Sequence, residues 1–320
     1  MREPVSIRVR TKGASDPMSN PYRGFFTILN TPFDTRGEII WADLERLADF
    51  VCRSGCHGVV WPVNDSEFSL LSYGERLEGF KRVVAAVNKR LPVMLGVPDT
   101  SKQGAVAYSE AAARAGADAV IAMPPWHTKL GTREQIVDYY RAIGDASGLP
   151  ICIQNFSAPM GSDLSADAVA EICEKVPLAQ YIKEERIPQG DWLGSVITRR
   201  IPGLKSIFGG GICFSMMDLH RRGTAGNIAS SGAPDVHARV WNLMEAGEVE
   251  EAQRIQTLLN NLMRAEISTQ SLHGVKQALT LRGIFTAAVM RNQAPRTLDA
   301  FYVQEIARCL AQLEPYLVKV

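Results

Sequence analysis

The sequence lacks a net charge that would direct the protein to a charged partner. Its formal charge at pH 7 is +1, so the field of the whole molecule attracts neither nucleic acid nor an anionic membrane. No apolar run approaches the roughly 20 residues of a transmembrane helix, and the first residues lack the apolar core of a secretion signal. We therefore expect a cytoplasmic protein with no nucleic-acid or membrane partner.

Patterned cysteines are also missing. The six cysteines are scattered, and metal-site spacing occurs only at Cys52 and Cys56, four residues apart with His57 adjacent. The nearby sequence offers no further ligands, so we expect reduced thiols and no metal site. No nucleotide-binding pattern is present, and we expect no cofactor.

The sequence does contain a regular alternation of short apolar runs and helical patterns. Residues 1–21 are polar and aperiodic and are predicted to be a mobile tail. Eight apolar runs follow, and each is succeeded by apolar residues at helical spacing. The predicted strands are 24–29, 58–62, 91–97, 119–123, 150–154, 179–183, 204–208 and 224–230.

Eight strand–helix pairs predict a (β/α)8 barrel. Continuous apolar runs are typical of parallel strands buried on both faces, and parallel strands need crossovers, which here are helices. The alternative, a doubly wound open sheet, more often has about five to seven strands and a glycine-rich loop after the first. We predict an α/β fold with the barrel at 22–247. Residues 248–320 show only helical patterns and are predicted to be a C-terminal extension for support or oligomer contacts.

A lysine, Lys183, ends the sixth predicted strand. Burying an ammonium is costly unless it is paired or loses its proton, and an amine at such a place can form a Schiff base with a carbonyl substrate. Active sites of these barrels lie at the C-terminal ends of the strands, where Lys183 is the one lysine that a predicted strand delivers. Lys129, in the loop after the fourth strand, is the rival, and a lysine that simply reaches solvent is the plain alternative.

Motifs along the chain carry a resemblance to a known family. They include Thr31-Pro32-Phe33, Gly55-Cys56-His57-Gly58, Ser66-Glu67, Tyr181-Ile182-Lys183-Glu184 and Gly209-Gly210. In this order, from about residue 22 to 315, the sequence resembles the lysine-dependent aldolases and dehydratases related to dihydrodipicolinate synthase and N-acetylneuraminate lyase. The resemblance implies a lyase in which Lys183 forms an imine with the keto carbon of a 2-oxo acid. It also implies a homodimer or homotetramer.

Departures from the family pattern bear on the reaction. The loop after the second strand reads Val63-Asn64-Asp65-Ser66-Glu67 in place of the usual Gly-Thr-Thr-Gly-Glu. Gln154 stands where the family has the tyrosine that carries protons at the imine, and Trp126 replaces a second tyrosine. Without this relay dehydration is favoured, and the sequence looks like the branch that acts on 2-keto-3-deoxy-L-arabonate. Two alternatives stay open: a retro-aldol lyase that releases pyruvate, and a barrel that binds a 2-oxo acid without turnover.

The predicted site residues lie at the strand ends and in the loops that follow them. Besides the nucleophile Lys183, Gln154 would orient substrate or water, and His127, with an unperturbed pKa of ~6.5, could protonate a leaving hydroxyl. In the loop after the second strand, the substrate carboxylate or a sugar hydroxyl would be bound by Asn64, Asp65 and Ser66. Later in the chain, the pocket would be lined with the backbone groups of Gly210 and Ser230. Hydrogen bonding within the loop is the plain alternative for Asn64 and Ser66, as is a surface position for His127.

Overall fold

The computed structural model describes residues 22–125, 132–156, 163–211, 213–269, 272–291 and 298–320. Eight parallel strands close a barrel in chain order, with the last strand hydrogen-bonded to the first. The strands are β1 (Gly24–Ile28), β2 (Gly58–Trp61), β3 (Val93–Gly96), β4 (Ala119–Ala122), β5 (Ile151–Asn155), β6 (Ala179–Glu184), β7 (Ser206–Gly209) and β8 (Gly226–Ala229). The predicted (β/α)8 barrel is confirmed.

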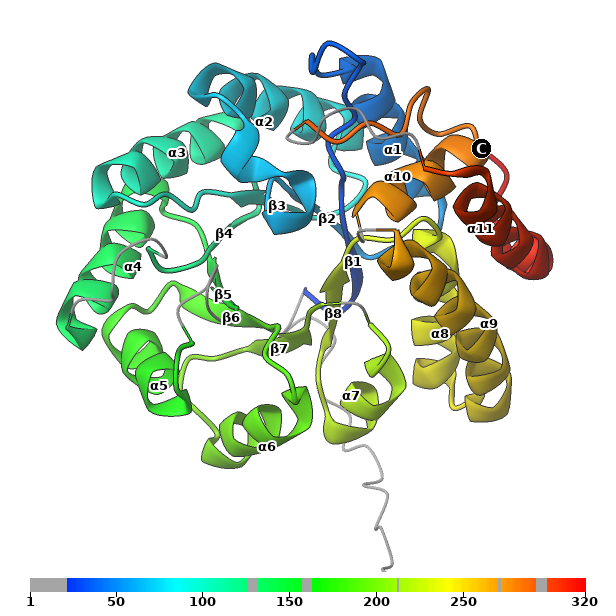
Figure 1. Cartoon of the computed structure of the whole chain (residues 1–320). Helices are drawn as coiled ribbons and strands as arrows, with labels where there is room; N and C mark the ends of the chain where they lie inside the picture. Colours follow the sequence, from blue (N-terminus) through cyan, green and yellow to red (C-terminus); the bar gives the residue numbers. More distant parts are fainter. Residues whose placement is uncertain (1–21, 126–131, 157–162, 212, 270–271, 292–297) are drawn as a thin grey trace, which may run out of the picture.

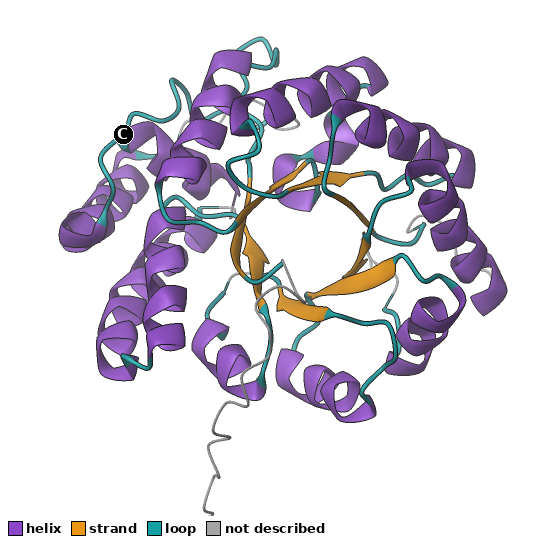
Figure 2. Cartoon of the chain, turned by 180° about the vertical axis from the view of Figure 1, so that it is seen from behind, coloured by secondary structure: helices purple, strands orange, loops and turns teal. Residues whose placement is uncertain are grey.

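Helices surround the ring of strands (Figures 1 and 2). They are α1 (Trp41–Arg53), α2 (Tyr73–Val87), α3 (Lys102–Ala115), α4 (Arg133–Ser147), α5 (Ala166–Lys175), α6 (Gln189–Arg199), α7 (Met216–Arg222) and α8 (Pro234–Ala246). The start of α3 is set by a local sequence feature. The Ser101 hydroxyl accepts a hydrogen bond from the Gly104 N–H at 3.0 Å and caps the first turn. No helix in the described part of the chain is long and apolar enough to cross a membrane.

The inside of the barrel is filled by every second residue of each strand. Successive strand side chains point to opposite faces, and the inward set forms a buried cluster that includes Phe26, Ile28, Val60, Met94, Ile121, Cys152, Tyr181, Phe208 and Ile228. Two residues further along their strands come Asn30, Gln154, Lys183, Gly210 and Ser230. The same alternation aims these five positions at the C-terminal mouth of the barrel.

The C-terminal extension consists of α9 (Val249–Ser268), α10 (Leu272–Leu281) and α11 (Ala300–Leu313), and it packs on α8 (Figure 1). It also reaches the barrel mouth. Glu67, in the loop after β2, has a left-handed backbone (φ 56°). Its buried carboxylate pairs with Lys276 of α10 and accepts the Arg291 N–H at 3.1 Å. The extension therefore fixes a loop more than 200 residues away in the sequence.

The Lys276–Glu67 pair yields a stability prediction. Lys276→Met leaves a buried carboxylate without its cation, so we expect the free energy of unfolding to fall by about 3–5 kcal/mol. The exposed pair of Lys102 and Asp138, with a 2.7 Å contact, is the control, and Lys102→Met should cost less than about 1 kcal/mol. Urea unfolding monitored by circular dichroism measures both. Equal losses in the two variants would contradict the expectation, and Glu67→Gln added to Lys276→Met should restore part of the stability.

Candidate active site

Strand β6 and the residue that follows it place two ionisable side chains inside the barrel mouth. Lys183 is flanked in the sheet by Gln154 of β5 and Phe208 of β7, and it stands above the inward-facing Tyr181. Glu185 follows two residues later, so strand alternation sends its side chain to the same side as Lys183. The neighbouring carboxylate Glu184 points the other way, where it accepts the Asn155 amide at 2.7 Å.

Lys183 and Glu185 form a buried ion pair. The Lys183 Nζ lies 2.8 Å from Glu185 Oε1, and the two side chains are 1% and 4% exposed. Gln154 donates its amide N–H to the same oxygen at 2.6 Å. Sequence reasoning missed Glu185 because it lies beyond the predicted strand; its spacing of two from Lys183 was the signal that could have found it.

The absence of a side chain at Gly210 leaves space for the Lys183–Glu185 pair. A Cβ at position 210 would lie 2.9 Å from Lys183 Cε and 2.3 Å from Glu185 Cγ, distances that no real side chain tolerates. The Gly210 N–H donates to the Glu184 carbonyl at 2.7 Å, which holds the backbone against β6. Gly210 therefore lies beside Lys183, and its missing side chain is what the position requires; its predicted contact with substrate stays a prediction.

The three predicted site residues in the loop after β2 point in different directions. Asp65 faces the mouth, where its Oδ2 accepts the Ser230 hydroxyl at 2.9 Å. Ser66 is turned into the loop: its hydroxyl donates to the Leu29 carbonyl at 2.6 Å and its N–H to Val63 at 2.8 Å. Asn64 directs its amide N–H toward Met123 Sδ at 3.7 Å. The structure thus brings Asp65 and Ser230 together and gives Ser66 a role in loop geometry; their contacts with substrate stay predictions.

A cavity of about 760 Å³ opens over this mouth. Among its described lining residues, five are carboxylic acids and Arg222 is the sole cation, paired at 2.8 Å with Asp218. The acids are Asp65, Glu185, Asp191, Asp218 and Glu266. The extension, which the sequence assigned to support or oligomer contacts, supplies one wall of the cavity through Met263, Glu266, Ile267 and Val275.

Three buried amide oxygens at the mouth have no hydrogen-bond partner among the described residues: Asn30 Oδ1, Asn64 Oδ1 and Gln154 Oε1. Buried acceptors left in this way favour a ligand that donates hydrogen bonds. The predicted acid His127, its neighbour Trp126 and the rival Lys129 lie outside the described residues.

Burial changes the acid strength of two carboxylic acids near the site. Desolvation raises the pKa of Glu266 to about 8, against which the Gly232 N–H at 3.0 Å works only weakly. Desolvation also raises the pKa of Glu184 to about 7. Both carboxyl groups therefore hold their protons to a higher pH than an exposed glutamate does.

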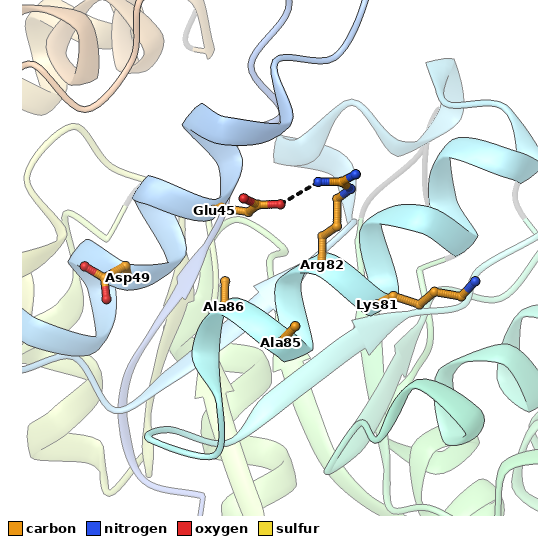
Figure 3. A pocket seen from close by; sticks show the side chains of 6 residues that line it. All are labelled: Glu45, Asp49, Lys81, Arg82, Ala85 and Ala86. Atoms are coloured by element: carbon orange, nitrogen blue, oxygen red, sulfur yellow. Dashed lines mark hydrogen bonds and ion pairs between the residues drawn. The ribbon is translucent and has the colours of Figure 1, made fainter.

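A second hollow lies on the outer helical ring between α1 and α2 (Figure 3). It measures about 510 Å³, and charged side chains line most of it. Arg82 crosses it to Glu45 at 2.7 Å. Such half-exposed pairs contribute little to binding or stability, so the barrel mouth is the better candidate site. Within the described residues, no cluster of three or more His, Cys, Asp or Glu side chains could hold a metal ion.

Comparison with known proteins places the chain among relatives of one family. The sequence profile of the dihydrodipicolinate synthetase family matches residues 21–300. A 4-hydroxy-tetrahydrodipicolinate synthase of Thermodesulfovibrio yellowstonii is 28% identical over 82% of this chain and 89% of its own. One from Stutzerimonas stutzeri is 30% identical over 82% and 88%. A prophage protein of the same family from E. coli K12, solved in complex with pyruvate, superposes with a TM-score of 0.83 at 23% identity, covering 92% of this chain and 99% of its own.

Glu266 yields a prediction for stability against pH. Its carboxyl has a pKa of about 8 when folded and near 4.5 as the ordinary value, so the folded state holds the proton more tightly. The resulting stabilisation is complete below pH 4.5 and is lost as pH rises through 8, at up to about 1.4 kcal/mol per pH unit. Glu266→Gln should remove this pH-dependent loss of stability. Between pH 5.5 and 8 its free energy of unfolding, measured with urea, should therefore rise relative to that of the wild type. Glu250→Gln, exposed on the same helix, is the control; parallel curves for wild type and Glu266→Gln would refute the prediction.

Proposed function

The chain belongs to the dihydrodipicolinate synthetase family, a family of lyases that use a lysine Schiff base, and from that premise we propose that Lys183 forms an imine with the keto carbon of a 2-oxo acid. The observation that carries the proposal is a lysine buried at a strand end, 2.8 Å from a buried carboxylate, Glu185, that lines a cavity. Such a lysine has both a proton acceptor for its activation and space for a carbonyl compound.

We propose further that the reaction is dehydration of a 2-keto-3-deoxy sugar acid such as 2-keto-3-deoxy-L-arabonate. The acid-rich lining supports a substrate whose far end is not a second carboxylate, because like charges would repel. The three buried amide acceptors support a substrate that carries hydroxyl groups. Gln154, in place of a phenol, supports a reaction that does not use the usual relay of the family.

Glu185 can supply the proton transfers that imine formation needs. Its carboxylate takes a proton from the Lys183 ammonium, and the neutral amine adds to the keto carbon C2. The amine's next proton passes to the C2 oxygen, and Glu185 returns the first one, so that the oxygen leaves as water. The product is a protonated imine beside a carboxylate, which reproduces the charges of the resting ion pair.

The same carboxylate can serve the elimination. The imine nitrogen accepts electrons, so the C3 proton becomes acidic and Glu185 takes it, which gives an enamine. The enamine expels the C4 hydroxyl, and this hydroxyl takes the proton from Glu185 and leaves as water. One water then hydrolyses the imine and restores Lys183. The net change is loss of one water from C3 and C4, and for the pentonate the product tautomerises to 2-oxoglutarate semialdehyde.

We also propose a cytoplasmic homodimer or homotetramer, as the resemblance implies. The six cysteines are free thiols in the structure, which suits a reducing compartment. Burial raises the pKa of Cys213, which lines the cavity, to about 12, so this thiol stays protonated and is a poor competitor of Lys183 for the substrate carbonyl.

Reductive trapping tests the nucleophile. Incubation with pyruvate and borohydride should add one reduced adduct at Lys183, located by peptide mass, and Lys183→Met should abolish it. Lys205→Met is the control, because Lys205 precedes β7 at the opposite end of the barrel, and it should keep the adduct. An adduct elsewhere would overturn the assignment. With the 2-keto-3-deoxypentonate, 2-oxoglutarate semialdehyde identifies a dehydratase, released pyruvate a retro-aldol lyase, and an adduct without turnover a binding protein.

Deuterium exchange tests Glu185. The wild type in D2O should exchange the methyl protons of pyruvate through the enamine, followed by proton NMR. Glu185→Gln should slow this exchange by about 10²–10⁴-fold while long incubation with borohydride still traps the imine. Glu184→Gln neutralises the adjacent carboxylate on the outer face and should exchange within about threefold of the wild type. Exchange at the wild-type rate in Glu185→Gln would rule out its role as the base.

A further inference from the structure

We propose that the wall added by α9 and α10 is the subsite for the far end of the substrate, and that Glu266 recognises a neutral oxygen there by donating a hydrogen bond. The substrate class is thereby narrowed to 2-oxo acids with an uncharged, hydroxylated tail. The inference rests on the proposed function, because it assumes that the keto end of the substrate is fixed at Lys183.

The wall is one face of a helix. Glu266 and Ile267 come three and four residues after Met263 along α9, which places both of them beside Met263 on one face. Val275 of α10 completes the wall. Three of these four side chains are apolar, so they suit the carbon skeleton of a tail, and Glu266 is the one polar group that can give the tail a defined orientation.

Glu266 is held in place by the loop after β8. Its Oε1 accepts the Gly232 N–H at 3.0 Å, and a Cβ on Gly232 would lie 2.5 Å from that oxygen. On the other side of this loop, Arg282 donates to the Gly232 carbonyl at 3.0 Å and pairs with the buried Asp235 at 2.8 Å. Among the described residues the only recorded hydrogen bond of the Glu266 carboxyl uses Oε1, so its second oxygen is available to a ligand.

The charges around Glu266 keep it a neutral donor. Across the cavity are Asp65 and Glu185, and on α6 and α7 are Asp191 and the Asp218–Arg222 pair. From α11 the nearby titratable group is Cys309. Beyond Gly232 stands Arg282, which Asp235 neutralises. No cation is therefore left over, within the described lining, to stabilise an ionised Glu266, and burial raises its pKa to about 8. The acids of the lining would repel a carboxylate in the substrate tail. A hydroxyl or carbonyl oxygen is uncharged and can accept a hydrogen bond from the Glu266 carboxyl group.

Trapping titrations with two 2-oxo acids test the subsite. The concentration that half-saturates borohydride trapping at Lys183 is measured for pyruvate and for 4,5-dihydroxy-2-oxopentanoate, with the wild type, Glu266→Gln and Glu266→Leu. Pyruvate ends at C3 and has no hydroxylated tail to bind Glu266, so it should give values within about twofold in all three. For the dihydroxy acid, Glu266→Leu should raise the value by about five- to tenfold, the loss of one neutral hydrogen bond. Glu266→Gln, which keeps a donor, should stay within about threefold.

The pH dependence separates this role from simple packing. Above pH 8 the wild type should lose its preference for the dihydroxy acid over pyruvate as Glu266 ionises, whereas Glu266→Gln should keep a constant preference. Unchanged half-saturation in Glu266→Leu, or the same pH profile in wild type and Glu266→Gln, overturns the inference. If the wild type fails to trap pyruvate at Lys183, the proposed function itself fails, an outcome that differs from both.

Discussion

The site depends on two opposite charges buried together. An isolated ammonium or carboxylate in a barrel interior costs several kcal/mol, and only close pairing with good hydrogen bonds offsets that cost. Lys183 and Glu185 meet this condition because one strand presents both and Gln154 donates to the same carboxylate oxygen. Imine formation keeps a cationic nitrogen at the same place, so the buried carboxylate retains its partner through the proposed reaction.

The mouth of the barrel is assembled from parts of the chain that lie far apart in sequence. Glu67, after β2, is held by Lys276 and the backbone of Arg291, while Gly232, after β8, lies between Glu266 and Arg282. Both attachments come from the C-terminal extension. The eight-stranded barrel thus provides the lysine and its carboxylate, and the extension sets the shape of the opening through which a substrate must reach them.

Local signals were sufficient to predict the fold and to single out Lys183, whose role in catalysis stays a proposal. Apolar runs and helical spacing gave all eight strands and their helices, because burial on both faces leaves a continuous pattern. Glu185 was missed because a polar residue after a strand looks like the start of a loop. The role proposed for Glu266 could not be predicted from the sequence, since helical periodicity shows which face of α9 is apolar but not which loop that face meets. For Ser66 the sequence left open substrate binding and hydrogen bonding within the loop, and in the structure its hydroxyl donates to the Leu29 carbonyl.

The alternation along β6 also bears on how accurately the chain folds. A shift of β6 by one residue would turn Ile182 and Glu184 into the barrel and drive Lys183 into the apolar layer beneath the helices. Glu184 would then face Gln154 with no cation beside it, and Lys183 would be a buried charge with no partner. Each misfolded register therefore carries an electrostatic penalty in addition to lost packing. The residues proposed for chemistry therefore also disfavour mispaired strands during assembly of the barrel.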